Sequence, residues 1–432
     1  MSTYIFISGK NWILSLAELT AYFKTRNNPF KIEYFSREYF VLSFQQKLDA
    51  QVIADLGGTI KIGEIKTNLP TEKVKDAFLG RNKLTQKQIA QTLAASTSVF
   101  EGMAKAPERL LFGVSVYFTD NSFSPVSGRL QRFVGSTIKD ELANLGKKAN
   151  FMGYSQDRKQ AQLTHVEVIK KNLVENQAEI LFCIGKKETY VAVTVAVHNP
   201  FEFQKRDIYK PNERKIFAMP PRLARMMVNL SLCTAGKTLL DPFCGVGTIL
   251  QEALLEKASV VGMDVNGWCV DAAKENLEWL IGEYGLEGAD FRVLQGNIDM
   301  LIAKVGVESV DCIVCEPDLG PALREVPTGA YAEGIIEKLK PLFYGFVEQA
   351  YMALKPNGRL VLVTPYIRTR SGQAVTMPID EKLAEVGFKR IYPFSKDMFE
   401  ESLDVGRLVG SGSLVEMDER HIIGREIHIL QK

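Results

Sequence analysis

The sequence lacks any apolar run long enough to cross a membrane. Its longest apolar stretches, such as residues 190–197 and 360–363, are short, whereas a spanning helix needs about 20 such residues. The first lysine follows an apolar segment, which is the reverse of the order in a secretory signal. We therefore predict a cytoplasmic protein that is not embedded in a membrane.

Cysteine and histidine are scarce, with 6 and 4 residues among 432. Cys312 and Cys315 have the spacing of half a zinc site, but no second Cys or His pair stands at ligand spacing, and VDCIVCEP is typical of a buried strand. We predict no metal and a reducing compartment. The histidines are scattered without partners at useful spacing, which favours structural roles.

The net charge is small, at +2, but it is unevenly distributed. Residues 1–218 contain 31 Lys and Arg against 21 Asp and Glu, a net charge of +10. The remaining residues contain 22 against 30, a net charge of −8. This asymmetry indicates one half that holds a polyanion and another that performs chemistry, although a chance imbalance spread over solvated faces is the alternative.

The order of sequence patterns predicts four segments and no internal repeat. Residues 1–68 combine short β-like runs with one helical pattern, which predicts a small α+β domain. Residues 69–198 form a second module of mixed helices and strands. Residues 199–221 contain four prolines and mixed charge without periodicity. Residues 199–218 are therefore predicted to be a basic linker. From 219 to 432, strands alternate with helices, which predicts an α/β fold with a doubly wound, mostly parallel sheet.

A cofactor motif, DPFCGVGT, stands between a strand and a helix of this last segment. Gly245 and Gly247 let the backbone turn sharply and approach a ligand closely. Asp264 follows Asp241 by 23 residues at the end of the next strand, where a carboxylate can accept hydrogen bonds from a ribose. The spacing predicts a nucleoside-binding crossover of the Rossmann type.

The turn favours S-adenosylmethionine over a dinucleotide. A dinucleotide fingerprint has three glycines that seat a pyrophosphate on a helix N-terminus, and here the third is absent. Asp241 would repel a pyrophosphate but suits the ammonium group of a methionine moiety. Gly296 and Asn297, at the end of the third strand, are candidates to face the adenine.

Three segments resemble one known family. They are SGKNWILSLAELTAYF at 8–23, RDIYKPNERKIFAMPPRLARMMVNLS at 206–231 and DPFCGVGTIL at 241–250. They are similar to the THUMP-containing tRNA guanosine N2-methyltransferases of the archaeal type that acts on guanosine 10. The resemblance implies a ferredoxin-like domain at 1–68, a THUMP RNA-binding domain at 69–198 and a Rossmann-like methyltransferase domain at 219–432.

The same resemblance implies an enzyme that methylates a guanosine N2 amine of tRNA with S-adenosylmethionine. The implied cofactor-binding residues are Asp241, Phe243, Gly245, Gly247, Thr248, Asp264, Asn297 and Glu316. The implied catalytic residues are Glu316, Pro317 and Asp318. The candidate RNA-binding residues are Lys147, Lys148, Lys170, Lys171, Lys205 and Arg206, although paired lysines are more often a solvated face. A need for a small activating subunit stays open.

The catalytic motif departs from the family pattern. The family has Asp or Asn, then Pro, Pro and an aromatic residue, whereas this chain has Glu316, Pro317, Asp318 and Leu319. Glu316 keeps an acceptor on a longer side chain, but Leu319 cannot stack on a base, an interaction worth about 1 to 3 kcal/mol. Other rings that could replace it are Tyr331, Tyr366 and Phe394. Two alternatives therefore remain: a catalytically silent tRNA-binding protein, and an amino-methyltransferase acting on another RNA or on DNA.

Overall fold

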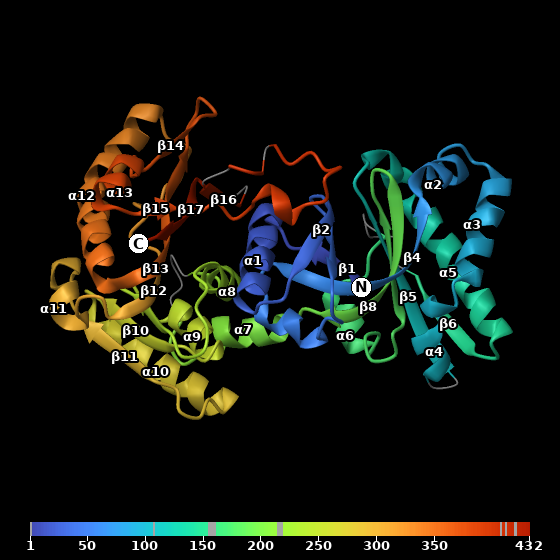
Figure 1. Cartoon of the computed structure of the whole chain (residues 1–432), viewed down its shortest axis with the longest axis horizontal. Helices are drawn as coiled ribbons and strands as arrows, with labels where there is room; N and C mark the ends of the chain where they lie inside the picture. The colour runs from blue at the N-terminus through green and yellow to red at the C-terminus, as the bar shows by residue number, and fades with distance from the viewer. Residues whose placement is uncertain are drawn as a thin grey trace.

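Two sheets, one from each half of the sequence, organise the molecule. The structure is a computed structural model that describes residues 2–106, 109–153, 161–213, 219–406, 408–410, 413–418 and 421–432. The two sheets stand side by side along the long axis of the molecule, and helices α1 (Trp12–Thr25) and α8 (Pro221–Leu230) lie between them (Figure 1).

The N-terminal sheet has eight strands in the order β2-β3-β1-β4-β8-β7-β5-β6. Their bounds are β1 (Ser2–Ser8), β2 (Phe30–Phe35), β3 (Tyr39–Phe44), β4 (Thr59–Pro70), β5 (Arg109–Phe118), β6 (Lys148–Met152), β7 (Glu179–Ile184) and β8 (Glu188–Val197). Strands β5, β6 and β7 run parallel, and the other pairings are antiparallel.

Strand β4 joins the two predicted N-terminal modules. It pairs with β1 over residues 59–64 and with β8 over residues 61–70. The predicted boundary between residues 68 and 69 falls at the end of this strand, and the sheet continues across it. The division into two domains therefore stays a prediction.

Helices pack on strands β5 to β8 of the N-terminal sheet in one apolar core. They are α2 (Thr71–Phe78), α3 (Lys83–Ala95), α4 (Glu101–Lys105), α5 (Ser127–Asn144) and α6 (His165–Lys170). Apolar residues repeat along α5 at Leu130, Val134, Ile138 and Leu142, and all four are buried in one core. This spacing places them on one helical face, which explains why the segment packs on the sheet.

The predicted linker begins as a helix, α7 (Pro200–Ile208). Asn199 caps it by accepting a hydrogen bond from the Phe201 amide, and Pro200 occupies the first helical position. Both are favourable at a helix start. Residues 214–218 lie outside the described part of the chain.

The C-terminal sheet follows the order β11-β10-β9-β12-β13-β17-β15, with β14 beside β13 and β16 beside β17. Its strands are β9 (Thr238–Asp241), β10 (Ser259–Asp264), β11 (Phe291–Gln295), β12 (Val310–Cys315), β13 (Leu354–Arg368), β14 (Ala374–Thr376), β15 (Lys389–Arg390), β16 (Ser413–Glu416) and β17 (Ile423–Gln431). The first five in the order are parallel, and β17 is antiparallel to β13 and β15. The predicted doubly wound, mostly parallel sheet is confirmed, and β17 and β15 extend it as an antiparallel edge.

Helices cover both faces of this sheet. They are α9 (Thr248–Leu255), α10 (Gly267–Tyr284), α11 (Leu301–Val305), α12 (Gly329–Ala353) and α13 (Asp380–Val386). Apolar residues of α8, α9 and α10 join one core, and those of α11, α12 and α13 join another. The chain reverses direction across the sheet between β9 and β12, and open α/β sheets bind ligands outside the carboxyl ends of strands at such a point.

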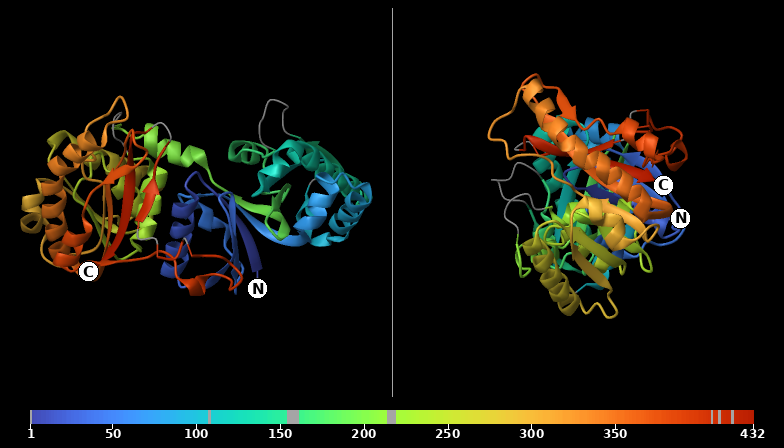
Figure 2. Two further views of the ribbon diagram at one scale, coloured as in Figure 1. Left: turned by 90° about the horizontal axis from the view of Figure 1, so that it is seen from above. Right: turned by 90° about the vertical axis from the view of Figure 1, so that its left-hand side faces the viewer.

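The two halves share one apolar core rather than merely touching. Leu14 and Leu19 of α1 belong to the same buried cluster as Met227 of α8 and Leu250 of α9. Near the C-terminus, the described residues between β15 and β16 (391–406 and 408–410) run along the N-terminal half, and β16 then joins β17 (Figure 2). In this segment the Glu400 amide donates to the Ile32 carbonyl at 2.9 Å, and in β16 the Val415 carbonyl accepts from the Asn11 side chain.

No helix among the described residues has the length and apolar character needed to span a membrane.

Candidate active site

A Gly-rich turn after β9 forms the first wall of the candidate site. Gly245 and Gly247 have φ values of +50° and +86°, a region that disfavours side chains. A Cβ on Gly247 would also lie 3.3 Å from the Ala273 side chain of α10. Both glycines are therefore required by this turn, which ends where α9 begins at Thr248.

Asp264, at the end of β10, holds this turn in place. Its Oδ2 accepts the Gly245 amide and its Oδ1 accepts the Asn266 amide, both at 2.9 Å. Each carboxylate oxygen has a second lone pair. The side chain can therefore support the loop and still accept hydroxyl groups from a ribose, the role that the sequence predicts for it.

Asp241 lies at the end of β9 and is almost fully buried. Its Oδ1 accepts the Phe243 amide at 3.1 Å. Burial raises the pKa of the Asp241 carboxyl well above its ordinary value, and the nearby charges of Asp264 and Glu316 add to that shift. A cationic ligand group would offset both the burial and the neighbouring negative charges, and would favour the ionised carboxylate. This fits the predicted contact with the ammonium group of a methionine moiety.

A buried lysine, Lys210, reaches the same turn from the segment after α7. Its Nζ donates to the Thr248 hydroxyl at 3.2 Å. The sequence prediction counted Lys210 only as part of a basic linker. Lys210 lies in the segment 206–231, which resembles the family and leads into β9, and this position is the sequence feature that could have identified it as a site residue.

Glu316, just after β12, forms the second wall and is ion-paired with Arg425 of β17. The guanidinium contacts both carboxylate oxygens, through Nε to Oε2 and through Nη2 to Oε1 at 3.2 Å. Arg425 Nη1 also donates to Glu416 of β16 at 3.3 Å. Burial opposes the charged arginine, but the two carboxylates outweigh it and raise the pKa of Arg425 above its ordinary value. The sequence prediction missed Arg425, because pairing across the sheet sets this contact.

The rest of the catalytic motif is also occupied by internal contacts. Pro317 is buried, and the exposed Asp318 accepts the Gly320 amide at 2.9 Å. Leu319 packs against the core shared by the two halves. Asp318 therefore shapes the turn, and no ring occupies the position where the family has its aromatic residue.

The three candidate replacement rings differ in accessibility. Tyr331, near the start of α12, is 59% exposed, and Tyr366 of β13 is partly buried. Tyr366 pairs in register with Gly424, the neighbour of Arg425. Phe394 is buried against Phe399 and cannot reach a base in this conformation.

The remaining cofactor candidates lie around the same strand ends. Phe243 is partly buried and packs edge-on against Phe346 of α12, with 5.3 Å between ring centroids. Asn297 is exposed directly after β11, and its side chain donates to Asp299 at 3.4 Å. Their proximity to a bound cofactor stays a prediction.

The candidate RNA-binding residues divide into two groups. Lys148, Lys170 and Lys171 are exposed on the N-terminal half, and the partly buried Lys147 donates to the Ala106 carbonyl at 2.7 Å. Lys205 is ion-paired with Glu283 of α10.

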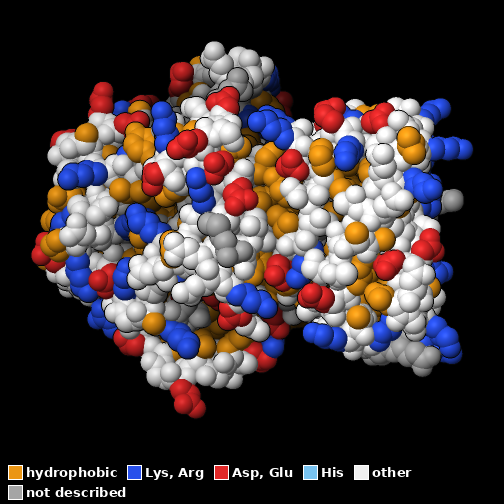
Figure 3. Space-filling view, turned by 45° about the vertical axis from the view of Figure 1, so that its right-hand side comes forward, with side chains coloured by type: hydrophobic (Ala, Val, Ile, Leu, Met, Phe, Trp, Pro, Cys, Tyr) orange, Lys and Arg blue, Asp and Glu red, His pale blue; other side chains and the backbone are white. Residues whose placement is uncertain are grey.

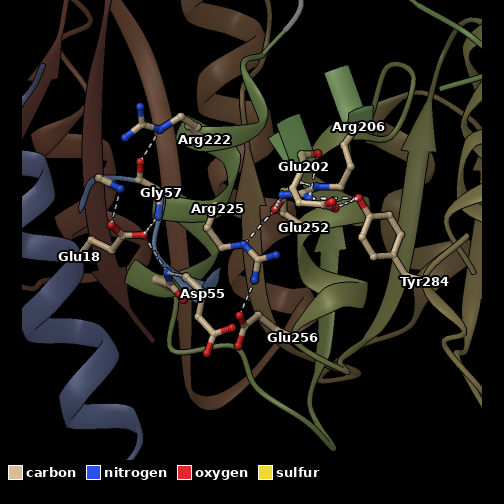
Figure 4. A network of polar contacts seen from close by, with 12 residues as sticks. Glu18, Asp55, Gly57, Glu202, Arg206, Arg222, Arg225, Glu252, Glu256 and Tyr284 are labelled. Atoms are coloured by element: carbon tan, nitrogen blue, oxygen red, sulfur yellow. Dashed lines mark hydrogen bonds and ion pairs between the residues drawn. The ribbon is translucent and has the colours of Figure 1, made fainter. Parts of the chain in front are cut away.

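Arg206 does not suit its predicted role. It lies buried in a network with Glu252 and Tyr284, and its Nε contacts Glu252 at 2.6 Å (Figure 4). Arg225 of α8 bonds the same carboxylate at 2.8 Å. In this structure Arg206 is not available to a phosphate, because its guanidinium is already paired with the Glu252 carboxylate.

Further cations were not among the sequence candidates. Figure 3 shows Lys and Arg side chains along the outer edge of the N-terminal half. Helices α3 and α5 lie at that end, and the exposed cations in and beside them include Arg81, Lys83, Lys87, Arg129, Arg132 and Lys139. Single cations on helix faces give no sequence motif, which explains why they were missed.

Two of the histidines meet in space. The rings of His165 and His198 are 5.9 Å apart between centroids. Burial lowers the pKa of His198 to about 3, so it is neutral at physiological pH. No cluster of three or more His, Cys, Asp or Glu residues that could hold a metal ion occurs in the described part of the chain.

Comparisons with known proteins agree on the C-terminal half. Residues 211–371, which contain the Gly-rich turn and Glu316, match the family model of the RMKL-like methyltransferase domain. This segment is therefore similar to a methyltransferase domain. A second family model, described as DNA methylase, matches residues 146–275, which start within the N-terminal sheet.

Curated relatives match part of the chain. A tRNA (guanine(10)-N2)-dimethyltransferase of Methanothermobacter thermautotrophicus is 36% identical over 160 residues, covering 36% of this chain and 42% of the relative. The protein of the same name from Methanocaldococcus jannaschii is 31% identical over 181 residues, covering 40% and 46%. The matches thus span less than half the length of these relatives.

Solved structures match the whole architecture. TrmN from Thermus thermophilus superimposes with a TM-score of 0.54 at 15% identity, covering 100% of both chains. A possible methylase from Clostridium difficile gives 0.51 at 14% identity, covering 100% of this chain and 97% of the other. These likenesses show that the fold of both halves occurs in known proteins.

Proposed function

We propose that this protein transfers a methyl group from S-adenosylmethionine to the exocyclic N2 amine of a guanosine in tRNA, at position 10. The observation that carries the proposal is the methyltransferase domain at residues 211–371, whose segment holds both walls of the site. The names of the relatives that are 30–36% identical support the substrate. A tRNA substrate also supports a cytoplasmic location.

The residues around the Gly-rich turn fit this cofactor. The buried carboxylate of Asp241 suits the methionine ammonium, and Asp264 can accept the ribose hydroxyls. Phe243 follows β9 and Asn297 follows β11, the two strands on either side of β10, where they can border the adenosine. When bound, the cofactor supplies a methyl group already activated as an electrophile.

Glu316 is the residue we assign to the target amine. The amine is a poor nucleophile because its lone pair is delocalised into the guanine ring, so orientation carries the catalysis. A carboxylate oxygen that accepts an N–H from the amine fixes the direction of attack. Arg425 holds this carboxylate through both oxygens, and each oxygen keeps a lone pair for the amine.

The N-terminal half is assigned to tRNA, as ferredoxin-like and THUMP modules. Its support is the charge asymmetry and the exposed lysines at positions 148, 170 and 171. Counterion release from phosphates makes such binding sensitive to salt. We therefore expect tRNA affinity to fall steeply between about 50 and 200 mM salt.

One observation favours a second candidate, a tRNA-binding protein without catalysis. Glu316 is already neutralised by Arg425, and Leu319 packs into the core instead of offering a ring. A site with these partners would still bind the cofactor. It would present a weaker acceptor and no stacking surface to the target base.

Transfer of tritium from labelled S-adenosylmethionine to unmodified tRNA separates the two candidates. The proposal expects label in tRNA with the purified chain alone, which also tests the need for an activating subunit. Nucleoside analysis of the product should give N2-methylated guanosine. A tRNA with adenosine at position 10 is the matched control. Tight tRNA binding without any label in RNA or DNA would establish the second candidate.

A further inference from the structure

Lys210 is a buried cation placed directly against the Gly-rich turn. Only 6% of its surface is exposed. Its ammonium donates to the hydroxyl of Thr248, the first residue of α9. The side chain thus points at the helix N-terminus that borders the candidate cofactor site.

This ammonium lacks an anionic partner. Among the residues that the structure describes, no carboxylate lies within 4.0 Å of Lys210 Nζ. Glu252 lies on the same helix but is bonded to Arg206 and Arg225. Burial lowers the pKa of Lys210, and more distant carboxylates, with Asp207 first, only partly oppose that effect. Burying an unpaired charge is costly, so a lysine kept here needs a reason.

The position of Lys210 is fixed by a second buried side chain. Asn276 of α10 accepts the Asn212 amide at 2.8 Å and donates to the Asn212 carbonyl at 3.0 Å. It also donates to the Val246 carbonyl, inside the Gly-rich turn, at 2.9 Å. One amide therefore clamps the backbone next to Lys210 to the turn, and the lysine is not a mobile surface residue.

Support of the helix does not explain this arrangement. A helix N-terminus carries a partial positive charge, so a cation beside it is unfavourable. The same features become favourable when an anion binds between them. The Thr248 hydroxyl accepts from Lys210 and keeps its own proton to donate, and the first amides of α9 are free of helical partners.

We propose that Lys210, with Thr248, binds the carboxylate of the methionine moiety of S-adenosylmethionine. This inference rests on the proposed function and adds to it the residue that recognises the anionic end of the cofactor. Asp241 and Lys210 then provide one charge of each sign for a zwitterionic amino acid. The paired charges favour the intact methionine moiety over analogues that lack the carboxylate.

Two ligands that differ in this group alone test the proposal. S-adenosylmethionine and its decarboxylated form are titrated by calorimetry into the full-length parent, Lys210→Met and Lys210→Arg. The parent should prefer the intact cofactor by roughly tenfold or more, the value of a hydrogen bond to a charged group. Lys210→Met should lose most of this preference, and Lys210→Arg should retain part of it.

Lys205→Met is the matched control, because Lys205 lies five residues earlier, in α7, and pairs with Glu283. It should keep the full preference of the parent. An equal loss of affinity for both ligands in Lys210→Met, with native circular dichroism, would overturn the role in carboxylate binding. An unchanged preference in that variant would do the same. If the parent binds neither ligand, the cofactor assignment itself fails, and this inference falls with it.

Discussion

The two walls of the site differ in how their charged groups are paired. At the cofactor wall, Asp241 and Lys210 are buried, and neither has an ion-pair partner among the residues that the structure describes. At the acceptor wall, Glu316 is bonded to Arg425, and Asp318 is bonded to the backbone of its own turn. Both walls stand at carboxyl ends of adjacent strands, β9 and β12.

This difference indicates which wall needs a ligand to pair its charged groups. Unpaired buried charges are costly unless a bound group pairs with them. The cofactor wall is therefore built for an occupant that brings charges of both signs. The carboxylates of the acceptor wall already have partners within the protein. A substrate must therefore bind the carboxylate lone pairs that these internal contacts leave free.

Arg425→Met should give the largest change in stability, because it removes the cation that pairs with the carboxylates of the acceptor wall. It leaves two carboxylates, Glu316 and Glu416, without their cation, and these side chains are only 13% and 25% exposed. We expect a loss of about 3 kcal/mol in the free energy of unfolding, near the low end for a broken buried pair. Urea titration followed by circular dichroism measures it.

The double variant Glu316→Gln with Arg425→Met is the control for this change. Removing both charges should restore part of the lost stability, because no unpaired carboxylate remains at position 316. A loss below about 0.5 kcal/mol in Arg425→Met, the size of an ordinary surface change, would show that the ion pair does not close this wall.

Asp264→Ala should weaken the cofactor wall by a smaller amount. The change removes the proposed ribose acceptor and also the anchor of the Gly245 and Asn266 amides. Cofactor affinity should fall by about 1.5 to 3 kcal/mol, the range for hydrogen bonds to a charged group. Asp264→Asn keeps one acceptor oxygen and should lose less. Equal affinities of parent and alanine variant in calorimetry would place the ribose elsewhere.

Glu316→Ala tests whether Glu316, although paired with Arg425, positions the target amine for methyl transfer. If Glu316 positions the amine, turnover should fall by about tenfold or more, while the affinities for tRNA and cofactor change little. Glu316→Gln keeps an acceptor and should retain partial activity. Single-turnover transfer assays measure both. Variants that methylate as fast as an active parent would assign the positioning to Asp318 or to a backbone carbonyl.

The cofactor wall was largely predictable from the sequence. Gly245, Gly247 and Asp264 act through local backbone geometry and a fixed strand spacing, and these leave a motif. The order of strands and helices predicted the sheet in the same way. Lys210 escaped prediction because its segment has no periodicity, and only packing against α9 reveals its role.

The acceptor wall was predictable in position but not in chemistry. The sequence placed Glu316 after the fourth strand, yet Arg425 lies 109 residues away and meets it only through the pairing of β17. Arg206 is the opposite case. It was predicted to contact RNA, and folding buries it against Glu252. Contacts between distant segments leave no local signal, and the same holds for the apolar core that joins the two halves.

Cofactor binding should depend on pH through Asp241, which gives the smallest expected effect. Burial raises the pKa of this carboxyl, so the free folded protein keeps a proton that the unfolded chain has lost above about pH 4. That proton stabilises the fold at low pH, and the contribution is lost as pH rises through the raised pKa. A bound ammonium favours the ionised carboxylate and lowers the pKa again. Binding must therefore release a proton within this window.

The affinity for S-adenosylmethionine should accordingly rise with pH by at most about tenfold per unit between the ordinary and the raised pKa of Asp241. Calorimetry in buffers of different ionisation enthalpy counts the released protons directly. Asp241→Asn is the matched variant, because it keeps the acceptor for the Phe243 amide but cannot titrate. Its affinity should be lower than that of the parent at high pH and nearly independent of pH. Proton release that persists in this variant would mean that another group titrates on binding, and Asp241 would then be only a support for the turn.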